Sequence, residues 1–180
     1  MKWIGQHIWD FISRFRSDVY LESINSQKIV TNIGLDINNK IVKSSINHIN
    51  IPSSTHFNFE GDVILTAAAG STTTGNLVYM RTDGVWADAD ADDAVKSTTL
   101  LGIAIGTDPT SDGVLIRGTF TLDHDVGNNQ GVPLYVSTTA GDITATAPSS
   151  SGDIVRVVGY NLGNDDEIWF NPSGSWVEIA

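Results

Sequence analysis

The C-terminal two thirds of the chain consists of short apolar runs separated by turn-forming residues. Residues 114–122 alternate between apolar and mostly polar positions, which is the pattern of a half-buried strand. Pairs such as Asp83-Gly84 and Asp112-Gly113 mark turns between the runs. Residues 62–180 hold about nine such runs, which predicts a mainly β fold, an antiparallel β-sandwich or barrel. One short helical turn is expected around Asp92 to Lys96, with acidic residues at its start.

The first 17 residues have a different period. Ile4, Ile8, Phe11 and Phe15 follow a 4-3-4 spacing, which on a helix forms one narrow apolar stripe. A lone helix of about 12 to 15 residues is marginally stable in water, so residues 1–17 are predicted to be an amphipathic helix that needs a partner. The stripe fits four uses: core of its own domain, a self-association seam, docking onto another protein, or a membrane surface.

Residues 18–61 are rich in Asn, Ser and Ile and carry thin apolar bursts. Ile33, Leu35 and Ile37 alternate as on a strand, and Asn38-Asn39 then predicts a turn. A faint repeat places a second, similar segment thirteen residues after Ile24. One chain could hardly bury enough here to offset its ordering entropy, whereas three chains around a common axis could. The prediction is a short fibrous β shaft in a homotrimer; the alternative is a plain meander attached to the C-terminal domain.

Charge and composition exclude several classes of function and partner. Residues 1–50 hold six Lys/Arg and four Asp/Glu, whereas residues 51–180 hold four Lys/Arg and seventeen Asp/Glu. The net charge of -11 argues against nucleic acid as a partner. The absence of cysteine excludes disulfides and thiolate chemistry, and no apolar run reaches the roughly 18 residues of a membrane span.

Candidate metal and catalytic motifs are weak. Asp88, Asp90, Asp92 and Asp93 suggest calcium, but the EF-hand pattern needs Gly and Glu where Asp93 and Thr99 stand. A solvated acidic loop is the simpler interpretation, as it is for residues 165–167. We therefore predict no metal site, no cofactor and no catalytic residue.

Two further motifs have simple structural interpretations. If Asp123-His124-Asp125 lies on a strand, its side chains alternate in direction and do not converge. The segment Gly70 to Gly75 resembles a phosphate loop but is followed by Asn76 where a Lys is required.

Aromatic residues offer one possible binding surface. Their rings could stack on sugars, although core packing or a subunit interface is the commoner use of such side chains. The candidates are Trp86, Trp169, Trp176, Tyr135 and Tyr160.

Two N-terminal segments carry a resemblance to known proteins. These are MKWIGQHIWDFISRFRSDVYLE (residues 1–22) and GLDINNKIVK (residues 34–43). Both resemble the start of fibre-type virion structural proteins of tailed bacteriophages. The strand and turn spacing at residues 75–78, 131–136 and 141–144 resembles that of small trimeric head-fibre and capsid-decoration domains.

The resemblance implies a non-enzymatic structural protein located in the virion. It implies attachment to another virion protein through the N-terminal segment and display of a C-terminal domain. That domain is expected either to contact a host surface glycan or protein or simply to decorate the head. The alternatives are a monomeric carbohydrate-binding β-sandwich module and a polysaccharide depolymerase.

Overall fold

A computed structural model of the chain describes residues 32–35, 41–44, 56–67, 70–127, 129–163 and 166–180. The chain divides into two compact units, residues 1–47 and residues 48–180. The predicted helix over residues 1–17, with its stripe of Ile4, Ile8, Phe11 and Phe15, lies outside the described residues.

The first unit contains one described pair of strands. Strand β1 (Asn32–Leu35) pairs in antiparallel fashion with β2 (Ile41–Ser44), with Leu35 opposite Ile41. Ile33 and Leu35 of the predicted alternating pattern therefore lie in a strand, and residues 41–44 form its partner. Ile37 and the predicted Asn38-Asn39 turn lie outside the described residues. Whether this hairpin belongs to a shared shaft stays a prediction.

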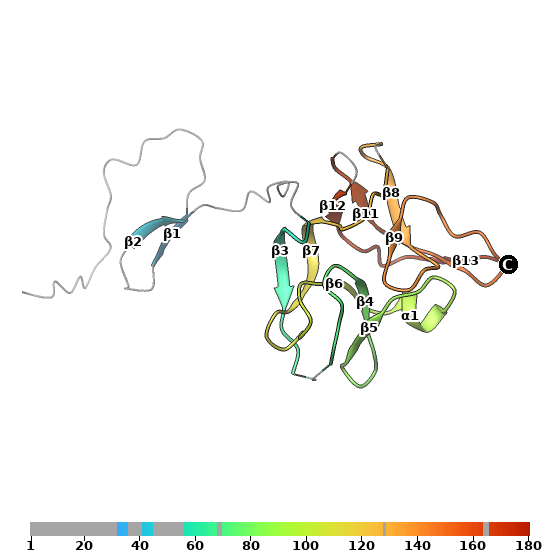
Figure 1. Ribbon diagram of the computed structural model, residues 1–180, viewed down its shortest axis with the longest axis horizontal. Coiled ribbons are helices and arrows are strands. Elements are labelled where there is room, and N and C mark those ends of the chain that lie inside the picture. The colour runs from blue at the N-terminus through green and yellow to red at the C-terminus, as the bar shows by residue number, and fades with distance from the viewer. Residues whose placement is uncertain (1–31, 36–40, 45–55, 68–69, 128, 164–165) are drawn as a thin grey trace, which may run out of the picture. The chain divides into compact units, whose positions relative to one another are not determined.

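The second unit is mainly β, as the apolar runs predict. Its described residues form one curled antiparallel sheet of nine strands (Figure 1). The order along the sheet is β5-β4-β6-β7-β12-β11-β8-β9, and β3 pairs with β7. The strands are β3 (Phe59–Ile64), β4 (Leu77–Met80), β5 (Trp86–Asp88), β6 (Leu101–Ala104), β7 (Val114–Thr121), β8 (Pro133–Val136), β9 (Ile143–Thr144), β11 (Val157–Asn161) and β12 (Glu167–Phe170).

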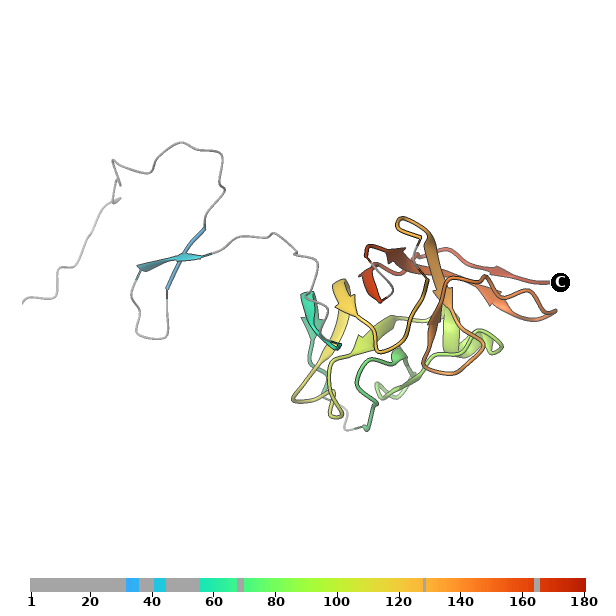
Figure 2. The same ribbon diagram turned by 45° about the horizontal axis from the view of Figure 1, so that its top comes forward.

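A second, smaller sheet lies at the C-terminal end. Strand β10 (Ile154–Val155) pairs with β13 (Val177–Glu178), close to the C-terminus (Figure 2). The single described helix, α1 (Ala94–Thr98), begins two residues after the expected Asp92. Asp93 caps it by accepting a hydrogen bond from the Val95 amide at 2.9 Å. No helix within the described ranges is long and apolar enough to cross a membrane.

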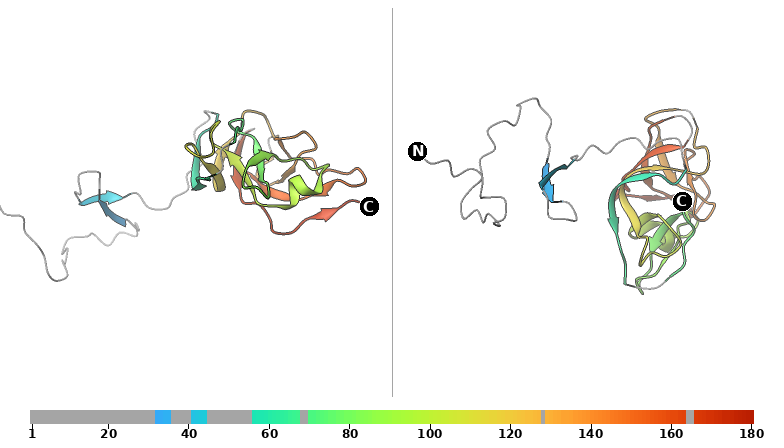
Figure 3. Two further views of the ribbon diagram at one scale, coloured as in Figure 1. Left: turned by 90° about the horizontal axis from the view of Figure 1, so that it is seen from below. Right: turned by 60° about the vertical axis from the view of Figure 1, so that its left-hand side comes forward.

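The long strand β7 organises the sheet because two lobes diverge from one of its edges. β3 pairs with β7 from Val114 to Phe120 along the other edge. Along the first edge, β6 pairs only with Val114 and Leu115 of β7, and β12 pairs with residues 118–121. The lobe β6-β4-β5 and the lobe β12-β11-β8-β9 therefore separate near Arg117. Figure 3 shows the curled sheet from two further sides.

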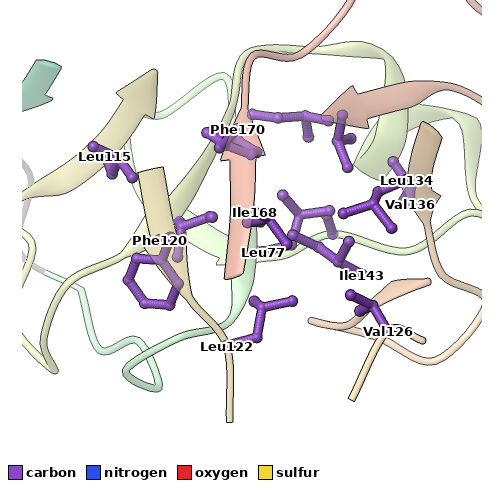
Figure 4. Packing of buried hydrophobic residues seen from close by; sticks show 14 of the residues in the cluster. Leu77, Leu115, Phe120, Leu122, Val126, Leu134, Val136, Ile143, Ile168 and Phe170 are labelled. Carbon is purple, nitrogen blue, oxygen red and sulfur yellow. The ribbon is translucent and has the colours of Figure 1, made fainter. Parts of the chain in front are cut away.

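The main hydrophobic core lies between these two lobes. Loop hydrogen bonds join the lobes again on the far side: the Leu77 amide donates to the Gly141 carbonyl at 2.7 Å, and the Gly141 amide donates to Ala89 at 2.8 Å. Figure 4 shows the packing. The larger side chains of this core come from both lobes and from β7: Leu77, Leu101, Ile103, Leu115, Phe120, Leu122, Leu134, Val136, Ile143, Val158, Ile168 and Phe170.

A glycine pair fixes the contact between β3 and β7. Gly61 lies opposite Gly118, and their φ angles are 157° and 150°. A Cβ atom on Gly118 would overlap the backbone at Glu60, and one on Gly61 would overlap the backbone at Arg117. The two strands reach this close approach only because neither residue has a side chain. The boundary predicted between residues 61 and 62 falls inside β3.

Candidate functional site: an aromatic outer face

Strands β11 and β12 place aromatic side chains on the outside of the sheet. Alternate residues Ile168 and Phe170 point into the core and are fully buried. Trp169, between them, therefore faces outward, directly opposite Tyr160 on β11. Directly opposed residues on neighbouring antiparallel strands have Cβ atoms about 4.5–5.5 Å apart, so the two side chains are neighbours.

The neighbouring strand β8 extends this surface. Pro133 lies opposite Tyr160, and Tyr135 shares its side of the strand because Leu134 and Val136 point into the core. We call Tyr135, Tyr160 and Trp169 the aromatic face. Tyr160 is 45% exposed, and the other two members are half-buried. Three of the five aromatic residues proposed from the sequence thus come together on three adjacent strands.

Arg117 borders the aromatic face on the β7 side. Its guanidinium carbon lies 5.7 Å from the centroid of the Trp169 ring, within cation–π range. Arg117 lies opposite Asp62 of β3 in the sheet register. The arginine approaches the ring from β7, the strand next to β12.

Trp86 does not join this surface. It is 2% exposed and packs in a second, smaller core with Val78, Ala104 and Val114, on the opposite side of the sheet from the main core. A Cβ at Gly102 would overlap the Cγ1 atom of Val114, so the glycine leaves room for that side chain in the smaller core. For Trp86 the core-packing alternative is the one observed.

Trp176 does not lie on the three strands that carry the aromatic face. It is 45% exposed and immediately precedes β13, in the smaller sheet. The sequence alone could not separate it from Trp169, because both lie in short apolar runs near the C-terminus.

A polar groove follows β9 on the same lobe. It has a volume of about 370 Å³ and is lined by residues that include His124, Asp142, Ser137 and Thr144. A second depression of about 240 Å³ continues past Ser137 and Thr144 towards Ser149 and Ser150. The hydroxyl oxygens of Ser137 and Thr144 each accept a hydrogen bond from the backbone amide two residues downstream, so both already have a partner within their own loops.

His124 closes one side of this groove, and both of its ring nitrogens are bonded. Nδ1 lies 3.0 Å from an Asp123 carboxylate oxygen, and Nε2 lies 3.0 Å from the Ile143 carbonyl oxygen. Both partners are acceptors, so both hydrogen bonds form only when the imidazole carries a proton on each nitrogen. Burial alone would lower the pKa of His124, but the bonds to Ile143 and Asp123 outweigh it and place the pKa above the usual 6.5.

This contact corrects an expectation from the sequence. Asp123 and His124 were expected not to converge if they lay on a strand. β7 ends at Thr121, however, and the two residues lie in the bend that follows it. The change of direction brings the two side chains together.

The acidic loop is bonded to its own surroundings. Asp88 accepts a hydrogen bond from the Asn76 amide at 3.1 Å, and Lys96 lies 3.5 Å from Asp90 and 3.7 Å from Asp93. A hydrogen bond with Asp90 and the negative charge of that residue raise the pKa of Asp92. Across the described ranges, no three or more His, Cys, Asp or Glu side chains are placed to hold a metal ion.

No family model, no curated protein and no solved structure matches the chain.

Proposed function

We propose that the protein is a non-enzymatic structural subunit of a bacteriophage virion. In this proposal a homotrimeric fibre or decoration protein is anchored through its N-terminal segment and contacts the host surface with its C-terminal β domain. The resemblance of residues 1–22 and 34–43 to fibre-type virion proteins supports the attachment role. The observation that carries the contact role is the opposed, outward-facing pair Tyr160 and Trp169.

The aromatic face has the properties of a contact surface that is already ordered before binding. Its rings are on strands whose other faces form the core, so few rotatable bonds remain to be fixed. Aromatic rings provide large apolar areas with little conformational entropy, and their faces suit the C–H surface of a pyranose ring. We therefore propose a glycan as the ligand of this face.

The test compares two exposed aromatic residues in different places. Tyr160→Ala and Trp176→Ala remove side chains that are each 45% exposed, but only the first lies on the aromatic face. Trp169→Ala is the third variant. Binding to whole host-type bacteria and to a panel of neutral polysaccharides is measured by pull-down and affinity electrophoresis.

Loss of a central aromatic contact typically costs at least about 2 kcal/mol, or roughly thirtyfold in affinity. We expect this loss for Trp169→Ala and Tyr160→Ala, and wild-type binding for Trp176→Ala. If all three variants bind as tightly as the wild type, the aromatic face is not the contact surface.

The subunit number separates the main proposal from a second candidate. A monomeric carbohydrate-binding module would use the same aromatic face, which is the observation that favours it. Light scattering distinguishes the two, because a trimer has three times the chain mass of 19.3 kDa. A mass of one chain at all concentrations would favour the monomeric module.

A further inference from the structure

The curled sheet leaves an apolar row exposed at one edge. Phe57 is 38% exposed, Phe59 41%, Val63 39% and Leu65 64%. They lie on or beside β3, two residues apart except across the glycine at position 61. We call these four side chains the β3 row.

The β3 row is a continuation of the main core. Phe59 lies opposite Phe120, and Val63 lies opposite Leu115. Paired residues point to the same side of a sheet, and both partners on β7 are fully buried in the main core. The apolar surface of the core therefore continues onto β3, where it is exposed to solvent and not covered by another element of the described structure.

Its position in the sheet makes the row accessible to another chain. β3 pairs with β7 along one side, and no other strand in the described part of the chain pairs with it. Natural proteins usually shorten, charge or cover such edges, because an exposed apolar edge strand associates readily. Of the residues that alternate with the row, Glu60, Asp62 and Ile64 belong to the opposite face of β3, where Ile64 packs against the smaller core.

We propose that the β3 row is the surface through which copies of this chain contact one another in the C-terminal unit. The inference rests on the homotrimer of the proposed function and names the surface that holds its displayed domains together. Chain connectivity favours a second copy over another partner. The segments predicted to bring three chains together all precede residue 62, and the row begins at Phe57.

Any clustering of the N-terminal regions thus tethers the β3 rows of different copies at high effective concentration, in the millimolar range for short linkers. A foreign partner has no such advantage. Identical apolar rows brought together in this way remove from water the part of the core surface that one copy leaves exposed.

The first test is crosslinking in the full-length protein, which has no cysteine of its own. Leu65→Cys and Val177→Cys place a single thiol at positions that are 64% and 62% exposed, one in the β3 row and one in the smaller sheet. A short bis-maleimide is added at low protein concentration, and covalently joined chains are counted by denaturing electrophoresis. We expect joined chains with Leu65→Cys and single chains with Val177→Cys.

The second test is the concentration dependence of the mass. The variant Phe59→Thr/Val63→Thr/Leu65→Thr is compared with Leu100→Thr/Val177→Thr, which removes apolar side chains exposed elsewhere. Far-ultraviolet circular dichroism checks that both variants fold. We expect the first variant to dissociate at a concentration at least tenfold higher than the wild type, and the control to match the wild type.

The outcomes separate this inference from the proposed function. Suppose that the wild type is a trimer, that the triple Thr variant dissociates like its control, and that Leu65→Cys crosslinks no more than Val177→Cys. This result overturns the role of the β3 row but leaves the homotrimer in place. A wild-type protein of 19.3 kDa at all concentrations overturns both.

Discussion

Arg156 provides a sharp test of how the C-terminal segment is held. Its side chain is 7% exposed, and it donates to three backbone carbonyl oxygens. Nη1 lies 2.7 Å from Ser97 and 2.7 Å from Thr99, and Nε lies 2.8 Å from Ser173. One guanidinium thus joins the end of α1 to the segment that leads into β13.

The magnitude follows from the competition between hydrogen bonding and desolvation. A hydrogen bond to a charged group contributes a net of about 1.5–3 kcal/mol, and three of them are made here. Burying the ion costs several kcal/mol, which offsets part of that gain and lowers the pKa of Arg156. Removing the guanidinium leaves the carbonyls behind without their donor, so we expect Arg156→Met to lower the free energy of unfolding by about 2–4 kcal/mol.

The assay is urea denaturation followed by tryptophan fluorescence, at one fixed protein concentration because association would shift the midpoint. With a slope of about 1.5 kcal/mol per M, a loss of about 3 kcal/mol moves the midpoint by about 2 M. Arg156→Lys keeps the charge but lacks the planar fork, so its midpoint should fall between those of the wild type and Arg156→Met.

The matched control is Arg117→Met, which removes an exposed arginine whose contact with Trp169 is worth at most about 1 kcal/mol. If Arg156→Met shifts the midpoint no more than Arg117→Met does, the three carbonyl bonds do not hold the C-terminal segment and the reasoning is wrong.

Two further predictions concern single residues. Gly118→Ala should lower the free energy of unfolding by about 3 kcal/mol in the same assay, because the added Cβ would overlap the Glu60 backbone. The control is Gly174→Ala, which has open space around the added Cβ and should stay within about 0.5 kcal/mol of the wild type. Because the pKa of His124 is raised above 6.5 in the folded state, its stabilisation is complete below pH 6.5 and is lost as the pH rises through the folded value. Denaturation at several pH values should therefore show a pH dependence that His124→Gln removes; a pH dependence of the same size in His124→Gln would refute the assignment to His124.

The sequence was sufficient for the local elements of the second unit. The alternation over residues 114–122 predicts the strand found as β7, although β7 is buried on both faces and not half-buried as predicted. The acidic start with a following lysine predicts α1 to within two residues. These signals depend only on side chains close together in the chain. Periodicity and capping therefore identify them without knowledge of the fold.

The candidate site depended on information that local patterns do not contain. Nothing near Trp86 distinguishes it from Trp169, yet one fills a core above Gly102 and the other faces outward. The difference comes from which face of the sheet is covered, and that is decided by pairing between distant strands. His124 illustrates the same limit, because its second acceptor, the Ile143 carbonyl, is nineteen residues away.

The charge balance of the second unit connects the two proposals. All four Lys/Arg side chains of residues 51–180 already interact within the described structure: Arg81 with Asp83, Lys96 with Asp90 and Asp93, Arg117 with Trp169, and Arg156 with three carbonyl oxygens. An anionic ligand would approach a strongly acidic surface on which residues 51–180 supply only four cationic side chains, which favours a neutral glycan.

The same charge opposes contact between copies, because each added copy brings thirteen further net negative charges in residues 51–180. Apolar contact through the β3 row must outweigh that repulsion. Salt screens charges over a Debye length of about 8 Å at physiological ionic strength, so association of the C-terminal units should strengthen as salt is added. Binding of a neutral glycan to the aromatic face carries no such charge term and should change little. A response to salt in the association of the C-terminal units and none in glycan binding would therefore assign the two surfaces to two different physical interactions.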